Sequence, residues 1–206
     1  MSESIAATNR LGLPALRWQS ILKPVVFVLA LTPFVYLVQS LLTGGLGPNP
    51  IDALTDTTGT LAIRMLLISL CVTPLRGLLK KTWPLKLRRM LGLFAFFYVF
   101  LHVSIYLVLD QQLDVAAIWE DLAERPYILA GTMALLILIP LAGTSTRGMV
   151  KRLGKRWVSL HRGVYVAGAA AVVHYVWLAK GDLIEPFVYL AILIVLLGYR
   201  FVKLLR

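Results

Sequence analysis

The stretch MLGLFAFFYVFLHVSIYLVL, residues 90–109, decides the fold, because its twenty residues include one histidine and no charged side chain. An uninterrupted apolar segment of this length crosses the hydrocarbon core of a bilayer as an α-helix. Five further segments are similarly apolar, so we expect six spans, near residues 21–42, 59–79, 90–109, 126–146, 157–178 and 186–202. The sequence therefore predicts an all-α integral membrane protein, built as a six-helix transmembrane bundle.

The composition agrees with this class. Hydrophobic residues make up 59% of the 206-residue chain and charged residues only 15%, far from the balance of a soluble domain. The expected connections are short, so we expect residues 1–206 to form a single transmembrane domain. A net charge of +11 would suit nucleic acid. We exclude nucleic-acid binding, because the basic residues gather in short connections between apolar segments, as membrane orientation requires.

The distribution of charge predicts how the chain is oriented. Lys and Arg are concentrated in the N-terminal segment, the second and fourth connections and the C-terminus, whereas the opposite face carries mostly Asp and Glu. Cytoplasmic loops are enriched in basic residues, so both termini are predicted to be cytoplasmic. The basic residues that set this orientation are Arg10, Arg17, Lys23, Lys80, Lys81, Lys86, Arg88, Arg89, Arg147, Lys151, Arg152, Lys155, Arg156, Arg200, Lys203 and Arg206. Of these, Lys86, Arg88, Arg89 and the residues from Arg147 to Arg156 are expected to contact lipid phosphates or, alternatively, an anionic cofactor such as a flavin phosphate at the inner face.

The three histidines of the chain all lie in the apolar segments, His102 in the third and His161 and His174 in the fifth. An imidazole in hydrocarbon is costly unless its nitrogens are satisfied, and haem iron accepts imidazole as an axial ligand. At a rise of about 1.5 Å per residue, His102 and His174 both lie roughly 6 to 10 Å below the outer boundary. His161 lies about 19 Å from His174 along the helix axis. We therefore predict that His102 and His174 share one haem and that His161 does not bind the same iron.

Two other features bear on this site. Arg64 is expected near the outer end of the second span, at a depth close to that of the paired histidines, where a haem propionate would neutralise it. The alternative is an arginine that extends its guanidinium outward from near a helix end. Ala167, Ala170 and Ala171 share a helical face with His174. Their small side chains leave room for a porphyrin or, alternatively, mediate close packing of helices.

Six segments carry a resemblance to a known family: RRMLGL at 88–93, LHVSIY at 101–106, RPYILAG at 125–131, PLAGTS at 140–145, LGKRWVSLHRGVY at 153–165 and HYVW at 174–177. Together they resemble the haem-bearing membrane subunits of bacterial methionine sulfoxide reductase systems, within the ferric-reductase-like transmembrane family. The resemblance covers nearly the whole chain after residue 15.

The resemblance implies a multi-pass protein of the bacterial inner membrane with six spans, haem b and FMN. It implies that electrons pass to a periplasmic molybdopterin-containing subunit, which reduces methionine sulfoxide. His102, His161 and His174 match the histidines of the family. Broader relatives carry cytoplasmic flavin and nicotinamide domains that this chain lacks, so we expect its donor to be a quinol or a separate cytoplasmic flavin reductase.

The broader ferric reductases and NADPH oxidases place two histidines on the third span and two on the fifth, which bind two stacked haems. The present chain has Arg88 and Arg89 where the inner histidine of the third span would fall. The role of His161 is therefore left open among an inner haem with another axial ligand, a flavin site, a quinol site and an interfacial histidine near the headgroups that binds no cofactor.

The function expected from these observations is electron transfer across the membrane from an inner donor to an outer partner. We expect an electron-transfer subunit of an oxidoreductase complex that contributes no catalytic residue, since two imidazole ligands leave no open coordination position. One alternative is a stand-alone ferric or quinone reductase. Another is a proton-coupled transporter, in which buried histidines relay protons and Arg64 gates the path.

Overall fold

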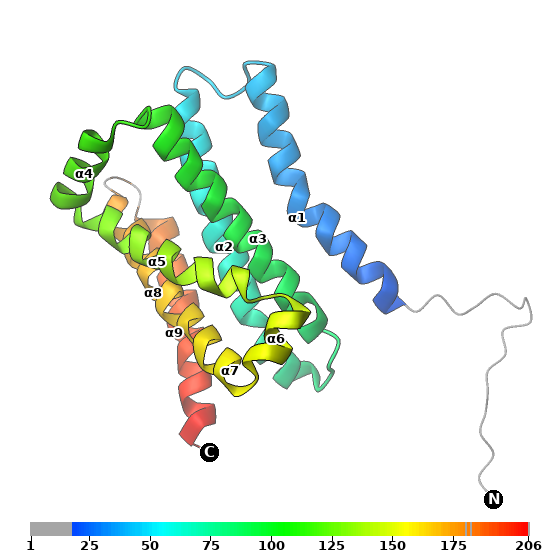
Figure 1. Ribbon diagram of the computed structural model, residues 1–206. Coiled ribbons are helices and arrows are strands. Elements are labelled where there is room, and N and C mark those ends of the chain that lie inside the picture. Colours follow the sequence, from blue (N-terminus) through cyan, green and yellow to red (C-terminus); the bar gives the residue numbers. More distant parts are fainter. Residues whose placement is uncertain (1–17, 180, 182, 206) are drawn as a thin grey trace, which may run out of the picture.

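The computed structural model describes residues 18–179, 181 and 183–205, so Arg10, Arg17 and Arg206 lie outside the described residues. Every regular element in the described part is helical, which confirms the all-α prediction (Figure 1). The elements are α1 (Trp18–Leu42), α2 (Pro50–Leu79), α3 (Leu85–Ile105), a π-helical turn (Tyr106–Asp110), α4 (Val115–Glu124), α5 (Pro126–Gly143), α6 (Arg147–Leu153), α7 (Lys155–His161), α8 (Gly163–Leu178) and α9 (Ile184–Leu205).

Within the described residues, five helices are long and apolar enough to cross a membrane. They are Ile21–Leu42, Pro50–Leu79, Leu85–Asp110, Pro126–Gly143 and Ile184–Lys203. The structure differs from the prediction at residues 157–178. The single helix expected there is interrupted at Arg162, between α7 and α8. Helix α8 has 16 residues and is about 24 Å long, less than the roughly 30 Å of a hydrocarbon core. The multi-pass class is confirmed, whereas the number of six spans is not.

Local signals explain several helix boundaries. Pro50 and Pro126 open α2 and α5 at positions where the missing N–H is not needed for a helical hydrogen bond. Asp114 caps α4, because its carboxylate accepts from the backbone N–H groups of Ala116 and Ala117. Gly154 separates α6 from α7 with a positive φ of 52°, a conformation that glycine adopts without steric cost.

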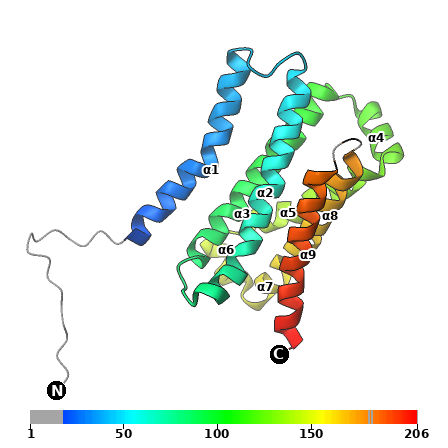
Figure 2. The same cartoon turned by 180° about the vertical axis from the view of Figure 1, so that it is seen from behind.

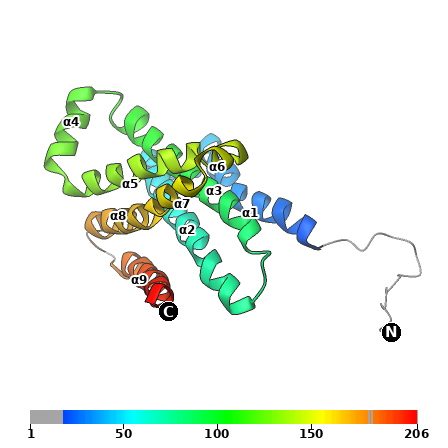
Figure 3. The same ribbon diagram turned by 60° about the horizontal axis from the view of Figure 1, so that its bottom comes forward.

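The bundle is organised around two closely packed helix pairs, α2 with α3 and α5 with α8. Helix α9 packs on α8 and α2, and α1 lies on the other side of α2 and α3 from α8 and α9 (Figure 3). Aromatic contacts join α1 to α3, with ring centroids 5.2 Å apart for Phe27 and Phe94. The fully buried Tyr98 donates from its hydroxyl to the carbonyl of Ala30 over 2.6 Å.

The two ends of the bundle carry different elements. The first residues of α1 and the last of α9 lie at the end that also holds α6, α7 and the α2–α3 connection (Figures 1 and 2). Helix α4 lies at the other end. The basic connections predicted from the sequence therefore gather at one end of the molecule, together with both described ends of the chain.

Candidate functional site

His102 and His174 face each other across the contact between the two helix pairs. His102 lies near the end of α3 and His174 near the end of α8. Their ring centroids are 6.3 Å apart, and the ring planes are inclined by 80°. The structure thus brings together the two histidines that the sequence places at equal depth.

Each imidazole is held by a backbone carbonyl of the partner helix. Nδ1 of His102 lies 3.0 Å from the carbonyl oxygen of Thr55 on α2, and Nδ1 of His174 lies 2.6 Å from that of Tyr127 on α5. A carbonyl oxygen only accepts, so Nδ1 of each ring donates its hydrogen and the neutral ring keeps its lone pair on Nε2. This tautomer is the one in which Nε2 can bind a metal, with a hydrogen bond at Nδ1 that orients the ring.

The donor set fits a metal held between the rings. If both rings bound one metal through Nε2 at about 2 Å, with each centroid about 1 Å beyond its nitrogen, the two centroids would be about 6 Å apart. The observed separation is 6.3 Å. Two neutral imidazoles that both carry the free lone pair on Nε2 are also the axial pair that a haem iron accepts in electron-transfer proteins.

Two glycines lie against these rings. A Cβ added at Gly59 would lie 3.1 Å from Cε1 and Nδ1 of His102. A Cβ added at Gly131 would lie 2.9 Å from Nδ1 of His174. The imidazoles therefore approach the backbones of α2 and α5 at points where a larger residue would press on them, tightly at Gly59 and closely enough to require a shift at Gly131.

His161 belongs to a different set of contacts. Its ring stacks on Trp157 with centroids 3.9 Å apart, and Nε2 lies 3.1 Å from Oγ1 of Thr144. The Thr144 hydroxyl donates to the carbonyl of Pro140 over 2.6 Å, so Nε2 of His161 is the donor to Thr144 and the neutral ring has its lone pair on Nδ1. The contacts of His161 are thus separate from those of His102 and His174.

Arg64 is paired within the protein. Its Nη2 lies 2.7 Å from Oε1 of Glu185, and its Nε donates to the hydroxyl of Tyr189 over 2.7 Å. The hydroxyls of Tyr189 and Tyr175 both donate to the carboxylate of Glu185. This network ties α2 to α8 and α9 and gives the guanidinium a counter-charge inside the protein.

The alanines near His174 take part in helix packing. Ala167 is completely buried in a cluster with Leu66, Ala95, Leu138 and Leu141. Close contact of α8 with its neighbours agrees with the packing interpretation of Ala167 and Ala171, which is compatible with room for a porphyrin.

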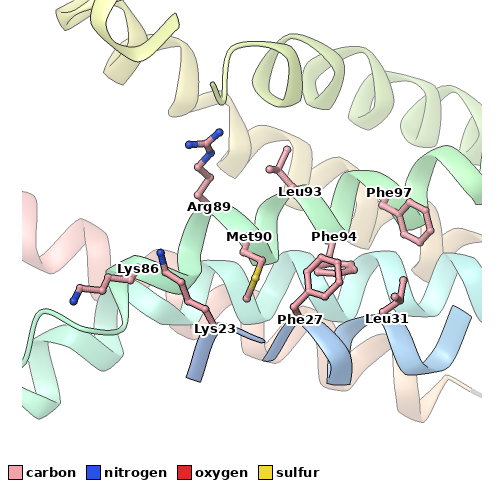
Figure 4. A pocket seen from close by; sticks show the side chains of 9 residues that line it. All are labelled: Lys23, Phe27, Leu31, Lys86, Arg89, Met90, Leu93, Phe94 and Phe97. Atoms are coloured by element: carbon pink, nitrogen blue, oxygen red, sulfur yellow. The ribbon is translucent and has the colours of Figure 1, made fainter. Parts of the chain in front are cut away.

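A groove of about 500 Å³ lies between α1 and α3, away from the paired histidines. One end carries basic side chains and the wall is apolar and aromatic. Figure 4 shows Lys23 extending from α1 toward α3 beside Met90, with Phe27 and Phe94 next to each other. The lining residues are Lys23, Phe27, Leu31, Lys86, Arg89, Met90, Leu93, Phe94 and Phe97.

Sequence reasoning missed the groups that hold the imidazoles, namely the carbonyls of Thr55 and Tyr127 and the glycines that follow each of them by four residues. Backbone carbonyls leave no trace in side-chain chemistry. A signal is nonetheless present, because each histidine follows the residue whose carbonyl accepts its hydrogen bond by the same 47 positions.

The chain matches known proteins over most of its length. Residues 58–172 match the family described as ferric reductase like transmembrane component. The chain is 51% identical over 182 residues to a protein of Rhodospirillum rubrum named protein-methionine-sulfoxide reductase heme-binding subunit MsrQ, with 88% of each chain covered. Proteins of the same name from Azospira oryzae and Agrobacterium fabrum are 46% and 43% identical, each over 195 residues and 94% of this chain, covering 84% and 90% of their own lengths. With paired histidines in an all-helical bundle and these relatives, the chain belongs to the ferric-reductase-like transmembrane family and, within it, to the MsrQ family.

Proposed function

We propose that the chain binds one haem b between α3 and α8, with His102 and His174 as its axial ligands, and conducts electrons across the membrane. The paired imidazoles carry this proposal, because both are held as Nδ1–H tautomers and their centroids lie 6.3 Å apart. Names of the relatives support it, since each is called a heme-binding subunit.

The residues of this chain bind and orient, and none is assigned to make or break a substrate bond. A bound haem supplies a one-electron ferric/ferrous couple. His102 and His174 would hold the haem iron from two sides, which would leave no position for a substrate at iron and would favour electron transfer. Arg64 remains our candidate for a haem propionate, since a guanidinium has five N–H donors and its bonds to Tyr189 and Glu185 engage Nε and Nη2.

We propose that the electron acceptor is a periplasmic molybdopterin-containing subunit that reduces methionine sulfoxide. The relatives are named as subunits of a protein-methionine-sulfoxide reductase, which supports an oxidised protein side chain as the final substrate. The proposed donor at the inner face is a quinol or a cytoplasmic flavin reductase. His161, with its stacked indole, remains a candidate inner site for a second haem, a flavin or a quinol.

We further propose that residues 1–206 form one domain of the bacterial inner membrane, with α8 as a sixth membrane helix and both termini in the cytoplasm. His174 on α8 lies beside His102 on the membrane-spanning α3, which supports this depth for α8. The end of the bundle that holds α6, α7 and the α2–α3 connection carries the basic residues, which supports its cytoplasmic assignment.

The groove between α1 and α3 is our candidate place for the FMN that the family resemblance implies. A phosphate suits basic side chains, and an isoalloxazine suits an apolar aromatic wall. We expect Lys23→Ala to weaken FMN binding roughly 10- to 100-fold, since a hydrogen bond to a charged group contributes about 1.5–3 kcal/mol. Fluorescence titration of purified protein measures this, with Lys203→Ala on the last turn of α9 as the control. Equal dissociation constants for the two variants would refute this location.

The proposed function is tested on protein purified in detergent. Haem is extracted from one sample and quantified. A second sample, with its haem still bound, is reduced and mixed with the partner reductase and methionine sulfoxide. We expect one haem b per chain, and reoxidation only when both partner and sulfoxide are present. Direct reduction of ferric chelates or quinones without a partner would instead support a stand-alone reductase. A folded wild-type protein without haem would contradict electron transfer and leave the transporter alternative.

A further inference from the structure

The two histidines lie in equivalent backbone surroundings on different helix pairs. In each case the imidazole donates to a carbonyl 47 residues earlier in the chain, Thr55 for His102 and Tyr127 for His174. A glycine, Gly59 or Gly131, follows that carbonyl residue by four positions. We call each carbonyl with its glycine a backbone platform, Thr55–Gly59 on α2 and Tyr127–Gly131 on α5.

Helix geometry explains why the glycine stands four residues after the carbonyl. In an α-helix the carbonyl of residue i points toward the N–H of residue i+4, and its second lone pair remains available. An imidazole that donates to this lone pair must approach beside the Cβ of residue i+4. The distances agree, because a Cβ at Gly59 would lie 3.1 Å from the His102 ring and one at Gly131 only 2.9 Å from Nδ1 of His174.

We propose that Gly59 and Gly131 are positioning residues that fix the orientation of the two axial imidazoles by keeping the Thr55 and Tyr127 carbonyls accessible. The inference rests on the proposed haem ligation by His102 and His174. It assigns a specific task to two residues that contribute no side chain. A methyl group at either platform displaces the ring from its carbonyl and turns or shifts Nε2.

Ring orientation has a spectroscopic consequence. The two ring planes are inclined by 80°, close to perpendicular. Perpendicular axial imidazoles donate into different iron d orbitals, which keeps those orbitals nearly equal in energy. The low-spin ferric signal in electron paramagnetic resonance has three principal g values. Perpendicular rings raise the largest of them, here called the highest g value, whereas near-parallel rings give a more rhombic signal. The platforms thus predict a large highest g value for the wild type.

The test compares alanine substitutions at four helical glycines in the full chain. Gly131→Ala and Gly59→Ala each add a methyl group against an imidazole. Gly168→Ala lies on α8 with His174, where a Cβ would meet only ordinary contacts at 3.6 Å, and Gly198→Ala on α9 meets nothing within 4 Å. Haem affinity, the paramagnetic resonance spectrum and the midpoint potential are measured on monodisperse protein, and folding is checked on protein produced without haem.

We expect Gly131→Ala and Gly59→Ala to weaken haem binding about 10- to 100-fold, the usual effect of removing a group that orients a metal-bound histidine. Haem that remains bound should show a changed highest g value and a shifted midpoint potential. Gly131→Ala should have the larger effect, because its Cβ is closer to the ring. The two control variants should match the wild type in all three measurements.

Two results would overturn the inference. One is unchanged affinity, spectrum and potential in both platform variants. The other is misfolding of both platform variants already without haem, while the controls fold, because the glycines would then serve helix packing in general. A wild-type protein that folds but holds no haem would contradict the proposed function itself, and that outcome is recognised before any variant is made.

Discussion

His102→Ala and His174→Ala are each expected to eliminate nearly all bound haem while the helical bundle stays folded. Each substitution removes one of the two imidazoles that lie 6.3 Å apart, and no second histidine stands in contact with the vacated position among the described residues. The loss should be equal from either side, since both ligands are needed for a six-coordinate iron. Extracted haem per chain and the Soret absorption of monodisperse protein measure the effect.

His161→Ala is the matched control for both variants. It removes an imidazole that stacks on Trp157 and bonds to Thr144, so the haem between α3 and α8 should remain at the wild-type level. If His161→Ala removed the haem and His174→Ala retained it, the assignment of the ligands would be wrong. A second haem lost only in His161→Ala would reveal an inner site in addition to the outer one.

Glu185→Ala is expected to lower the free energy of unfolding of the protein by about 1 to 3 kcal/mol. This is less than the cost of leaving a fully buried charge unpaired, because the side chains of Arg64 and Glu185 are both about half exposed. The substitution leaves the Arg64 guanidinium in the membrane-spanning α2 without its counter-charge, and it also removes the acceptor for two tyrosine hydroxyls. Charged groups within the membrane are costly unless they are paired. Thermal unfolding in detergent, followed by loss of monodisperse protein, measures this.

The double variant Arg64→Ala with Glu185→Ala separates pairing from other effects. We expect it to be more stable than Glu185→Ala alone, since the isolated charge is gone. A double variant whose loss equals the sum of the two single losses would show that the pair does not couple. Haem content of Arg64→Ala, measured in the same samples, reports whether the guanidinium also serves a propionate.

The membrane-spanning segments followed from apolar length alone, because a helix that crosses a bilayer needs about twenty apolar residues. The region from Lys155 to Leu178 was the exception. Its average hydropathy predicts one continuous span. The structure instead interrupts the helix at Arg162, which separates the seven-residue α7 from the sixteen-residue α8. Windowed averages smooth over such a break, so hydropathy identified an apolar segment here but did not reveal the interruption of its helix.

The pairing of the two histidines was predictable because the position of a residue along a membrane helix determines its depth in the bilayer. His102 and His174 each lie within the last turns of their helices, and the structure places their rings together. The groups that orient the rings were not predictable in the same way. Thr55 and Tyr127 act through backbone carbonyls, and Gly59 and Gly131 act through an absent side chain, so their roles depend on which helices pack together.

Arg64 illustrates the same limit. Its depth indicated a charge that needs a partner, and sequence reasoning offered a propionate or the headgroup region. The structure supplies Glu185, which is 121 positions away in the chain. An ion pair between α2 and α9 depends on the packing of two helices whose mutual orientation no local pattern specifies.

The most direct test of the central claim is the low-temperature electron paramagnetic resonance spectrum of the oxidised wild-type protein, with haem quantified in the same sample. Two axial imidazoles, one from α3 and one from α8, predict a low-spin ferric signal that accounts for one haem per chain and has a large highest g value. A high-spin ferric signal would mean that only one histidine binds the iron, and a folded sample without haem would mean that neither does.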